Sequence, residues 1–354
     1  MLTPLCRALG IDKPIIQAPM NWATDARLVA AVSNAGGLGV LGPNAGDEPP
    51  SADPQGVGER LRRQIKAIRA QTGNPFAVNV PIGRAGNRVF SDRSIDVLIE
   101  EGVRIAIIVT GSPEVYTARL KEAGVFVIHA VASVKHARKA ESCGVDAVVA
   151  EGFDAGGHSG FDEIPSASLV PQVAAACAIP VIYAGGVIDG RGLIAALGYG
   201  AQAVYMGSRF MATVECPIHD RVKQAIVAAD DNGTISWGRK TEIARTLKNK
   251  FTDEYKAREL SGASREDLHR FIADYGKMPG GRRFGGLRGG DIDEGEVYLG
   301  AGAGLIRDVV TCAEVIDRTM AEARETLRRL NAVFTSEPGE RPARIDTGRY
   351  AAPA

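Results

Sequence analysis

Lys13-Pro14-Ile15-Ile16-Gln17-Ala18-Pro19-Met20-Asn21-Trp22 is the stretch that decides between two folds open to this sequence. Its apolar middle predicts a buried strand that is entered and left at prolines, which cannot donate a hydrogen bond to a neighbouring strand. A doubly wound open sheet that binds a dinucleotide places a G-x-G-x-x-G turn directly after its first strand. Residues 18–22 occupy that place here. The stretch therefore favours a closed (β/α)8 barrel, with the open sheet as the alternative.

The same pattern of a short apolar strand followed by a helix continues as far as residue 206. Of all residues, 45% are hydrophobic but only 6% are aromatic, which fits a parallel sheet of aliphatic strands covered by helices. Eight strands separated by helical crossovers are the number that closes a barrel. The predicted strands are 13–20, 38–41, 75–81, 104–109, 125–129, 146–150, 179–184 and 202–206.

The pattern changes after residue 207, and we predict three regions. Residues 1–230 form the barrel, residues 231–335 form a helical and glycine-rich extension over the active-site face, and residues 336–354 form a tail. Within the extension, residues 233–262 are expected to be helical in pieces. Paired glycines between Gly276 and Gly304 predict either a loop that covers the substrate or a surface excursion.

Two further helices are predicted around the extension. Pro217 is expected to open the first, because proline is favoured in the first turn of a helix. The second is a long amphipathic helix over residues 305–330. Its apolar face is predicted to contain Val309, Ala313, Ile316 and Met320.

Charge and cysteine content limit the classes of function. The formal net charge is zero, with 42 basic and 42 acidic residues, so no overall field favours nucleic acid or a membrane surface. The five cysteines are widely spaced and form no C-x-x-C pair, which argues against a zinc or disulfide framework. No signal-like segment or membrane-length apolar run is present. We expect a cytoplasmic protein that acts on a small molecule.

A glycine-rich loop with a single histidine follows the sixth predicted strand. Glu151 follows that strand directly, and Gly156 and Gly157 precede His158. The glycines allow the backbone to approach a ligand closely, and an imidazole in such a place is a candidate acid or base. The alternative is an ordinary polar loop histidine. A metal site of His158 with Asp162 and Glu163 is not expected, because no second histidine stands at zinc spacing.

Two neighbouring strands end in glycine turns, and these predict a phosphate site. The turn after the seventh strand contains Gly185 and Gly186, and the turn after the eighth contains Gly207 and Ser208. Turns of this kind present free N–H groups, and barrels commonly bind phosphate after strands seven and eight. Glycines that merely permit tight turns are the other interpretation. No G-x-x-x-x-G-K-[ST] loop is present, which argues against a nucleoside triphosphate.

If the phosphate belongs to flavin mononucleotide (FMN), the flavin ring must lie over the first strands. Ala18, Pro19 and Met20 at the end of the first strand, and Asn79 near the end of the third, suit that place. A carboxamide on the pyrimidine edge and backbone N–H groups near N5 would hold and tune the ring. His129 and the remaining histidines receive less weight than His158.

These motifs together resemble the nitronate monooxygenases, formerly called 2-nitropropane dioxygenases, an FMN-dependent barrel family that includes quinone reductases and flavin enoyl-acyl-carrier-protein reductases. The resemblance runs from about Pro14 to His219. It is carried by Gln17-Ala18-Pro19-Met20, Asn34-Ala35-Gly36-Gly37-Leu38-Gly39, Ala155-Gly156-Gly157-His158, Ala184-Gly185-Gly186 and Met206-Gly207-Ser208-Arg209-Phe210.

The resemblance implies a role for each matching residue. His158 would be the base beside the flavin, and Met20 and Asn79 would neighbour its ring. The phosphate would be held by Gly185, Gly186, Gly207 and Ser208. The matching positions Ala184 and Met206 are included among the cofactor-binding residues, as is Ala130, although some relatives have Gln or Lys there. Ser208 replaces a commoner Thr and keeps the hydroxyl.

Three functions are carried forward. The first is an FMN-dependent oxidation of nitroalkanes or nitronates with O2, in which His158 is the base. The second is a reduction of quinones or enoyl thioesters by NADH or NADPH. The quinone reductase branch is resembled more closely by residues 162–165, 209–219, 290–293 and 300–306. The third is a non-enzymatic sensor of a phosphorylated metabolite. A homodimer is possible under each of them.

Overall fold

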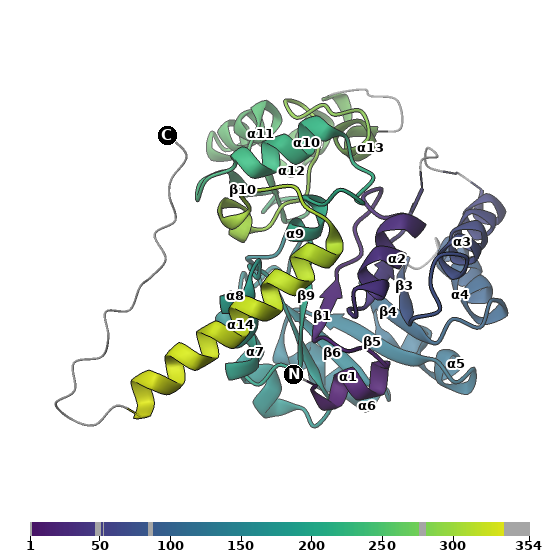
Figure 1. Ribbon diagram of the computed structural model, residues 1–354. Helices are drawn as coiled ribbons and strands as arrows, with labels where there is room; N and C mark the ends of the chain where they lie inside the picture. Colours follow the sequence, from purple (N-terminus) through teal and green to yellow (C-terminus); the bar gives the residue numbers. More distant parts are fainter. Residues whose placement is uncertain (1, 47–50, 52, 84–87, 276–280, 336–354) are drawn as a thin grey trace.

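The computed structural model describes residues 2–46, 51, 53–83, 88–275 and 281–335 (Figure 1). Its main sheet has eight parallel strands in the order β1-β9-β8-β6-β5-β4-β3-β2. The strands are β1 (Ile15–Gln17), β2 (Gly39–Leu41), β3 (Phe76–Pro81), β4 (Ile105–Val109), β5 (Phe126–Val131), β6 (Ala147–Glu151), β8 (Val181–Ala184) and β9 (Ala203–Met206). All eight predicted strands are therefore present, and the first is shorter than expected.

Backbone hydrogen bonds between the two ends of this sheet close it into a barrel. The Gln17 N–H donates to the Leu38 carbonyl and the Leu38 N–H donates to the Ile15 carbonyl, each at 3.0 Å. Ile16 and Leu38 form a parallel bridge between the first and last strands in the order. The (β/α)8 prediction is confirmed, and the open sheet is excluded.

Helices surround the barrel and fill the connections between its strands. Asp25 caps the second of them by accepting a 2.9 Å hydrogen bond from the Leu28 N–H, so that helix begins at Ala26. The elements are α1 (Pro4–Leu9), α2 (Ala26–Asn34), α3 (Pro54–Arg69), α4 (Val89–Glu100), η1 (Pro113–Val115), α5 (Thr117–Glu122), α6 (Val134–Ser142), α7 (Ser166–Ala176), α8 (Gly190–Gly198) and α9 (Ser208–Met211).

Successive strand residues alternate between two cores. Ile16, Val40 and Ile107 belong to the core that fills the barrel, while Ile15, Leu41 and Ile108 pack outward against the helices. This alternation follows from the two-residue period of a strand. It decides which residues at the strand ends can face a ligand.

The region after residue 230 contains two strands that the helical prediction missed. Strands β10 (Thr234–Trp237) and β11 (Ala244–Leu247) form an antiparallel hairpin, and β11 also pairs with the short strand β7 (Gly157–His158). The prediction of helix across residues 233–262 is therefore wrong for these residues. It is right for α11 (Lys250–Leu260), which is followed by α12 (Arg265–Asp274).

The helix expected to open at Pro217 begins later in the chain. Helix α10 (Asp220–Ala228) begins three residues after Pro217, because the His219 side chain caps it by accepting from the Arg221 N–H. The glycine-rich segment contains α13 (Gly281–Leu287) and the short helix η2 (Ala301–Leu305). Val297, Leu299 and Ala303 are fully buried, so the described part of this segment is packed rather than a surface excursion. Residues 276–280 and the predicted tail, 336–354, lie outside the described residues.

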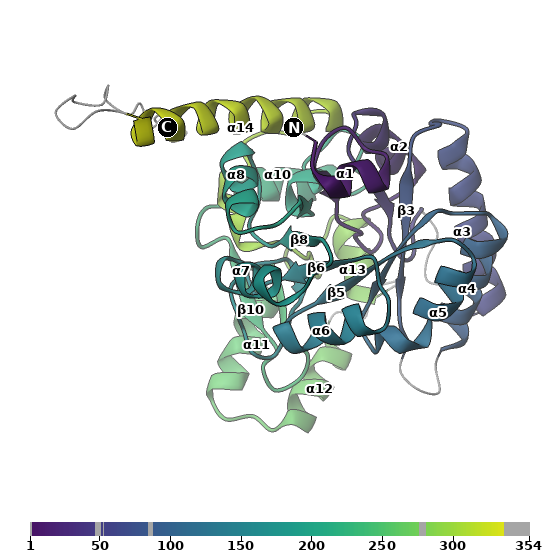
Figure 2. The same cartoon turned by 90° about the horizontal axis from the view of Figure 1, so that it is seen from below.

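The last helix, α14 (Cys312–Thr335), lies across α8 and α2, and its far end extends past the barrel (Figures 1 and 2). It begins seven residues later than predicted. Ile316 and Met320 are buried as expected, whereas Val309 and Ala313 are exposed. The buried face contains Cys312, Val315, Ile316, Thr319, Met320 and Ala323.

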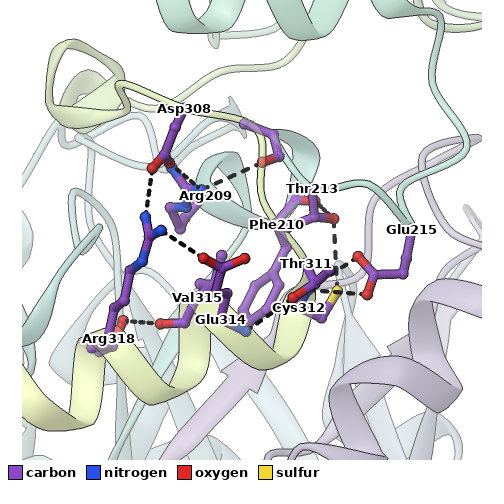
Figure 3. A network of polar contacts seen from close by, with 12 residues as sticks. Arg209, Phe210, Thr213, Glu215, Asp308, Thr311, Cys312, Glu314, Val315 and Arg318 are labelled. Carbon is purple, nitrogen blue, oxygen red and sulfur yellow. Dashed lines mark hydrogen bonds and ion pairs between the residues drawn. The ribbon is translucent and has the colours of Figure 1, made fainter.

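Ion pairs fasten the start of α14 to the barrel (Figure 3). Asp308 contacts Arg209, the residue after Ser208, at 2.9 Å and Arg318 at 2.5 Å. The Cys312 N–H donates to the Glu215 carboxylate at 3.0 Å, which satisfies a free N–H at the start of the helix. Within the described residues, no helix is both long and apolar enough to cross a membrane.

Candidate active site

A cavity of about 900 Å³ opens at the carboxyl ends of the barrel strands. Polar side chains and glycine turns from several strands meet there, as expected for the functional face of a barrel. All but one of the predicted site residues line it. They are Ala18, Pro19, Met20, Asn79, Ala130, Glu151, Gly156, Gly157, His158, Ala184, Gly185, Gly186, Gly207 and Ser208.

Met206 is the predicted site residue that does not line the cavity. Its side chain is 1% exposed and packs in the core between the strands and the helices. The strand alternation points the preceding residue, Tyr205, into the barrel instead. Met206 still supports the site, because its carbonyl accepts a 2.9 Å hydrogen bond from the Ala18 N–H.

The turn after β8 requires glycine. Gly185 has φ +119°, and a Cβ there would lie 2.2 Å from the Ser166 hydroxyl and 2.7 Å from the Asp154 carboxylate. Asp154 is held in place by hydrogen bonds from the Ser166 hydroxyl at 2.9 Å and the Ser166 N–H at 2.7 Å. Among the described residues, the N–H groups of Gly185, Gly186 and Gly207 donate no hydrogen bond. These free donors on a cavity wall fit a phosphoryl group.

A third part of this wall comes from the glycine-rich C-terminal segment. The Gly300 N–H donates to the Ser208 hydroxyl oxygen at 2.9 Å, and the Ala301 N–H donates to the Asp154 carbonyl at 2.9 Å. A Cβ at Gly302 would lie 2.7 Å from the Gly186 carbonyl oxygen. The Ser208 hydroxyl accepts from Gly300 and keeps its own proton for a ligand. Residues of the extension therefore complete the predicted phosphate site.

Polar groups that are largely buried also line the cavity. Burial raises the pKa of Glu151 to about 7, and the negative charge of Asp154 adds to the effect. The Tyr205 hydroxyl and His129 Nδ1 are buried without a hydrogen-bond partner in the described part of the chain. The Asn79 amide donates to the Ile107 carbonyl at 2.9 Å, which fixes its orientation. Unpartnered polar groups on a cavity wall fit the polar atoms of a flavin or its ribityl chain.

Glu151 makes the stability of the apoprotein depend on pH. Its folded pKa of about 7 lies above the ordinary value of roughly 4.3, so the folded state binds more protons in between. Stability should therefore fall as pH rises through this window. We expect the wild-type apoprotein to lose about 1 to 3 kcal/mol relative to Glu151→Gln between pH 5 and pH 8.

Chemical denaturation at the two pH values measures this difference. Glu122→Gln, at an exposed position at the end of α5, is the matched control and should follow the wild type. Parallel pH dependence in wild type and Glu151→Gln would show that Glu151 ionises normally.

His158 is held by a second sheet outside the barrel. Strand β7, which contains it, pairs with β11 so that His158 lies opposite Ala244. The side chain is 43% exposed, and its Nε2 lies 3.3 Å from the Glu242 carboxylate. The Tyr298 hydroxyl lies 3.5 Å from both ring nitrogens, and Arg283 Nη2 lies 3.5 Å from Nε2.

The surroundings of His158 favour its neutral form. Burial lowers its pKa first, and the Arg283 charge lowers it further, while Glu242 and Glu296 oppose both effects. A neutral imidazole has a lone pair and can accept a proton near neutral pH.

The sequence did not reveal the residues that surround His158. Glu242, Arg283 and Tyr298 lie in the extension, far from His158 along the chain, and no motif marks them. The described residues contain no group of three His, Cys, Asp or Glu side chains that could hold a metal ion. Glu163, one of the metal ligands considered above, pairs with Arg239 at 2.6 Å.

A barrel with glycine turns and a histidine at the carboxyl ends of its strands is the arrangement expected of the flavin-dependent barrel oxidoreductases. Residues 3–87 and 82–322 match the family described as nitronate monooxygenase. The chain therefore belongs to the nitronate monooxygenase family, as its motifs implied.

Similar proteins include a (3aS,4S,5R,7aS)-5-hydroxy-7a-methyl-1-oxo-octahydro-1H-indene-4-carboxyl-CoA dehydrogenase from Mycobacterium tuberculosis. It is 34% identical over 365 residues, which cover 94% of this chain and 98% of the relative. A nitronate monooxygenase from Paraburkholderia phytofirmans is 33% identical over 69% of this chain and 76% of its own.

Two solved structures have a similar fold. FabK from Thermotoga maritima superimposes with a TM-score of 0.83 at 35% identity, covering 94% of this chain and 99% of its own. The nitroalkane oxidase from Streptomyces ansochromogenes gives a TM-score of 0.74 at 28% identity, covering 90% of this chain and 98% of its own.

Proposed function

We propose that this protein is an FMN-dependent oxidoreductase in which His158 removes a proton from an acidic carbon of the substrate. The observation that carries the proposal is one cavity that is lined both by glycine turns whose N–H groups have no partner among the described residues and by His158. The donors of Gly185, Gly186 and Gly207, with the Ser208 hydroxyl, suit the phosphoryl group of FMN. Glu151 and Asn79 suit the polar atoms of its ribityl chain and ring.

The first candidate substrate is a nitroalkane or its nitronate, with O2 as the final electron acceptor. His158 would take the proton from the carbon beside the nitro group and hold it on the imidazole. Its lowered pKa keeps the ring able to accept that proton at neutral pH. When bound, FMN would supply the electron acceptor for the resulting carbanion.

The second candidate is hydride transfer from NADH or NADPH, through the flavin, to a quinone or an enoyl thioester. The supporting observation is coverage of the chain. The CoA-thioester dehydrogenase and FabK each align with 94% of this chain, whereas the nitronate monooxygenase aligns with 69%. In such a reduction the substrate gains a hydride and a proton, so His158 would act in the opposite direction, as a donor that delivers the proton to the reduced substrate.

The visible spectrum of the purified protein under anaerobic conditions tests the proposal. A bound flavin should give yellow absorbance, which a nitroalkane should bleach if the first candidate is right. Rapid bleaching by NADH or NADPH, without an effect of nitroalkanes, would favour the second. A colourless protein that FMN does not reconstitute would contradict both and leave the metabolite sensor.

A further inference from the structure

The register of the small sheet explains why a carboxylate reaches His158. Strands β7 and β11 are antiparallel, with Ala244 opposite His158 and Arg245 opposite Gly157. Glu242 lies two residues before Ala244, and side chains two apart in an extended chain lie on the same face. Diagonal neighbours across an antiparallel pair are within reach of long side chains. The pairing of the hairpin with β7 therefore places the Glu242 carboxylate beside the His158 imidazole.

Two groups of opposite charge approach the same ring atom. The Glu242 carboxylate is 3.3 Å from Nε2, and the Arg283 guanidinium is 3.5 Å from it. A carboxylate accepts a hydrogen bond and therefore requires a proton on Nε2, whereas a guanidinium only donates and requires a lone pair there. Nε2 therefore cannot form a hydrogen bond with both groups at the same time. The shorter contact is with Glu242.

We propose that Glu242 is the positioning residue that holds the proton of the neutral ring on Nε2, so that Nδ1 is the atom that accepts the substrate proton. The Tyr298 hydroxyl lies 3.5 Å from both ring nitrogens, and both His158 and Tyr298 line the cavity. This inference deepens the proposed role of His158 and depends on that role only for its catalytic consequence.

Arg283 has the complementary part in this arrangement. Its Nε lies 3.2 Å from the largely buried Glu296, and its guanidinium lies 4.9 Å from the centre of the Tyr298 ring. These contacts hold its positive charge beside the imidazole. Arg283 therefore disfavours a second proton before the substrate binds, while Glu242 stabilises the imidazolium that forms when the substrate proton arrives on Nδ1.

The proton is conserved in this step. It leaves the substrate carbon, the electron pair of that C–H bond stays with the substrate, and the proton becomes bonded to Nδ1. The Nε2 proton stays in place and donates to Glu242 throughout. The charged or titratable groups that face the ring are Glu242 before β11, Arg283 on α13, and Glu296 and Tyr298 in the segment that follows it.

Nitrogen-15 NMR of the histidine side chains tests the inference in the full-length protein as purified. The ring nitrogen shifts report which nitrogen carries the proton, and a pH series gives the midpoint of each titration. His158→Gln identifies the His158 signal among the five histidines. We expect the wild type to show the proton on Nε2 above the midpoint.

Each variant has a distinct expected result. Glu242→Gln keeps an acceptor without charge, so it should lower the midpoint by about 0.5 to 1 pH unit and leave the proton on Nε2. Glu242→Ala should lower the midpoint and also mix the two tautomers. Arg283→Met should raise the midpoint by a similar amount, and Arg283→Lys should restore it.

Glu294→Gln is the matched control, because Glu294 pairs with exposed Lys250 and does not contact His158. It should change neither reading. A wild-type proton on Nδ1, or unchanged tautomer and midpoint in Glu242→Ala, would overturn the inference. The NMR measurement does not require catalytic turnover. If the protein contained no flavin, the proposed function would be contradicted, but the position of the His158 proton could still be determined.

Discussion

His158→Ala should lower kcat/KM for a neutral nitroalkane by about 10²- to 10⁴-fold, because a positioned general base typically contributes that much to a rate. The variant should lose much less activity toward a nitronate prepared in advance, since that substrate has already given up its proton. Steady-state kinetics with both forms of one nitroalkane measure the difference. If the reduction of an enoyl thioester is the activity, a loss of similar size should appear in that reduction, because His158 would then donate the proton.

His269→Ala is the control for this experiment. His269 is exposed on α12 and is not among the residues that line the cavity, so its removal should leave both activities unchanged. Equal losses with the nitroalkane and the nitronate would remove the base assignment of His158. They would not affect the assignment of the cofactor.

Gly302→Ala should weaken FMN binding by about tenfold or more, which corresponds to roughly 1.4 kcal/mol. A Cβ at Gly302 would lie 2.7 Å from the Gly186 carbonyl and 2.9 Å from the Ile188 side chain. The segment must move away from the turn after β8, and this movement disturbs the wall that Gly300 and Ser208 share. Quenching of FMN fluorescence during titration of the apoprotein measures the dissociation constant.

Gly198→Ala provides the matched control. Gly198 is the last residue of α8, and a Cβ there would meet no heavy atom within 4 Å beyond its chain neighbours and the backbone of its own helix. This variant should bind FMN as the wild type does. Normal binding by Gly302→Ala, with an unchanged melting temperature, would show that the C-terminal segment does not contribute to the cofactor site.

The barrel could be predicted because its signals are local. Each strand is a short apolar run, and the glycines of the turns after β8 and β9 directly follow such runs, so both features can be recognised from neighbouring residues. The alternation of side chains also follows from local geometry, yet Met206 was assigned to the site although Tyr205 is the residue that points inward. A motif shared with a family identifies a position in the chain, but it does not show whether the backbone or the side chain at that position contacts the ligand.

The surroundings of His158 could not be predicted, because they depend on contacts between distant segments. Strands β10 and β11 have four residues each, and polar or charged residues interrupt their apolar pattern. Phe251 and Tyr255 of α11 pack against Trp237 of β10, so tertiary contacts rather than local propensity stabilise the hairpin. Glu242 reaches the imidazole only because this hairpin pairs with β7.

The bond from Gly300 to Ser208 joins residues that are 92 positions apart. During synthesis, the eight strands leave the ribosome well before the segment that completes the proposed phosphate site. We therefore expect a nascent or truncated barrel to hold its prosthetic group loosely, and tight retention to begin only when nearly the whole polypeptide has emerged. Loss of the cofactor would then report incomplete maturation of the C-terminal third of the protein.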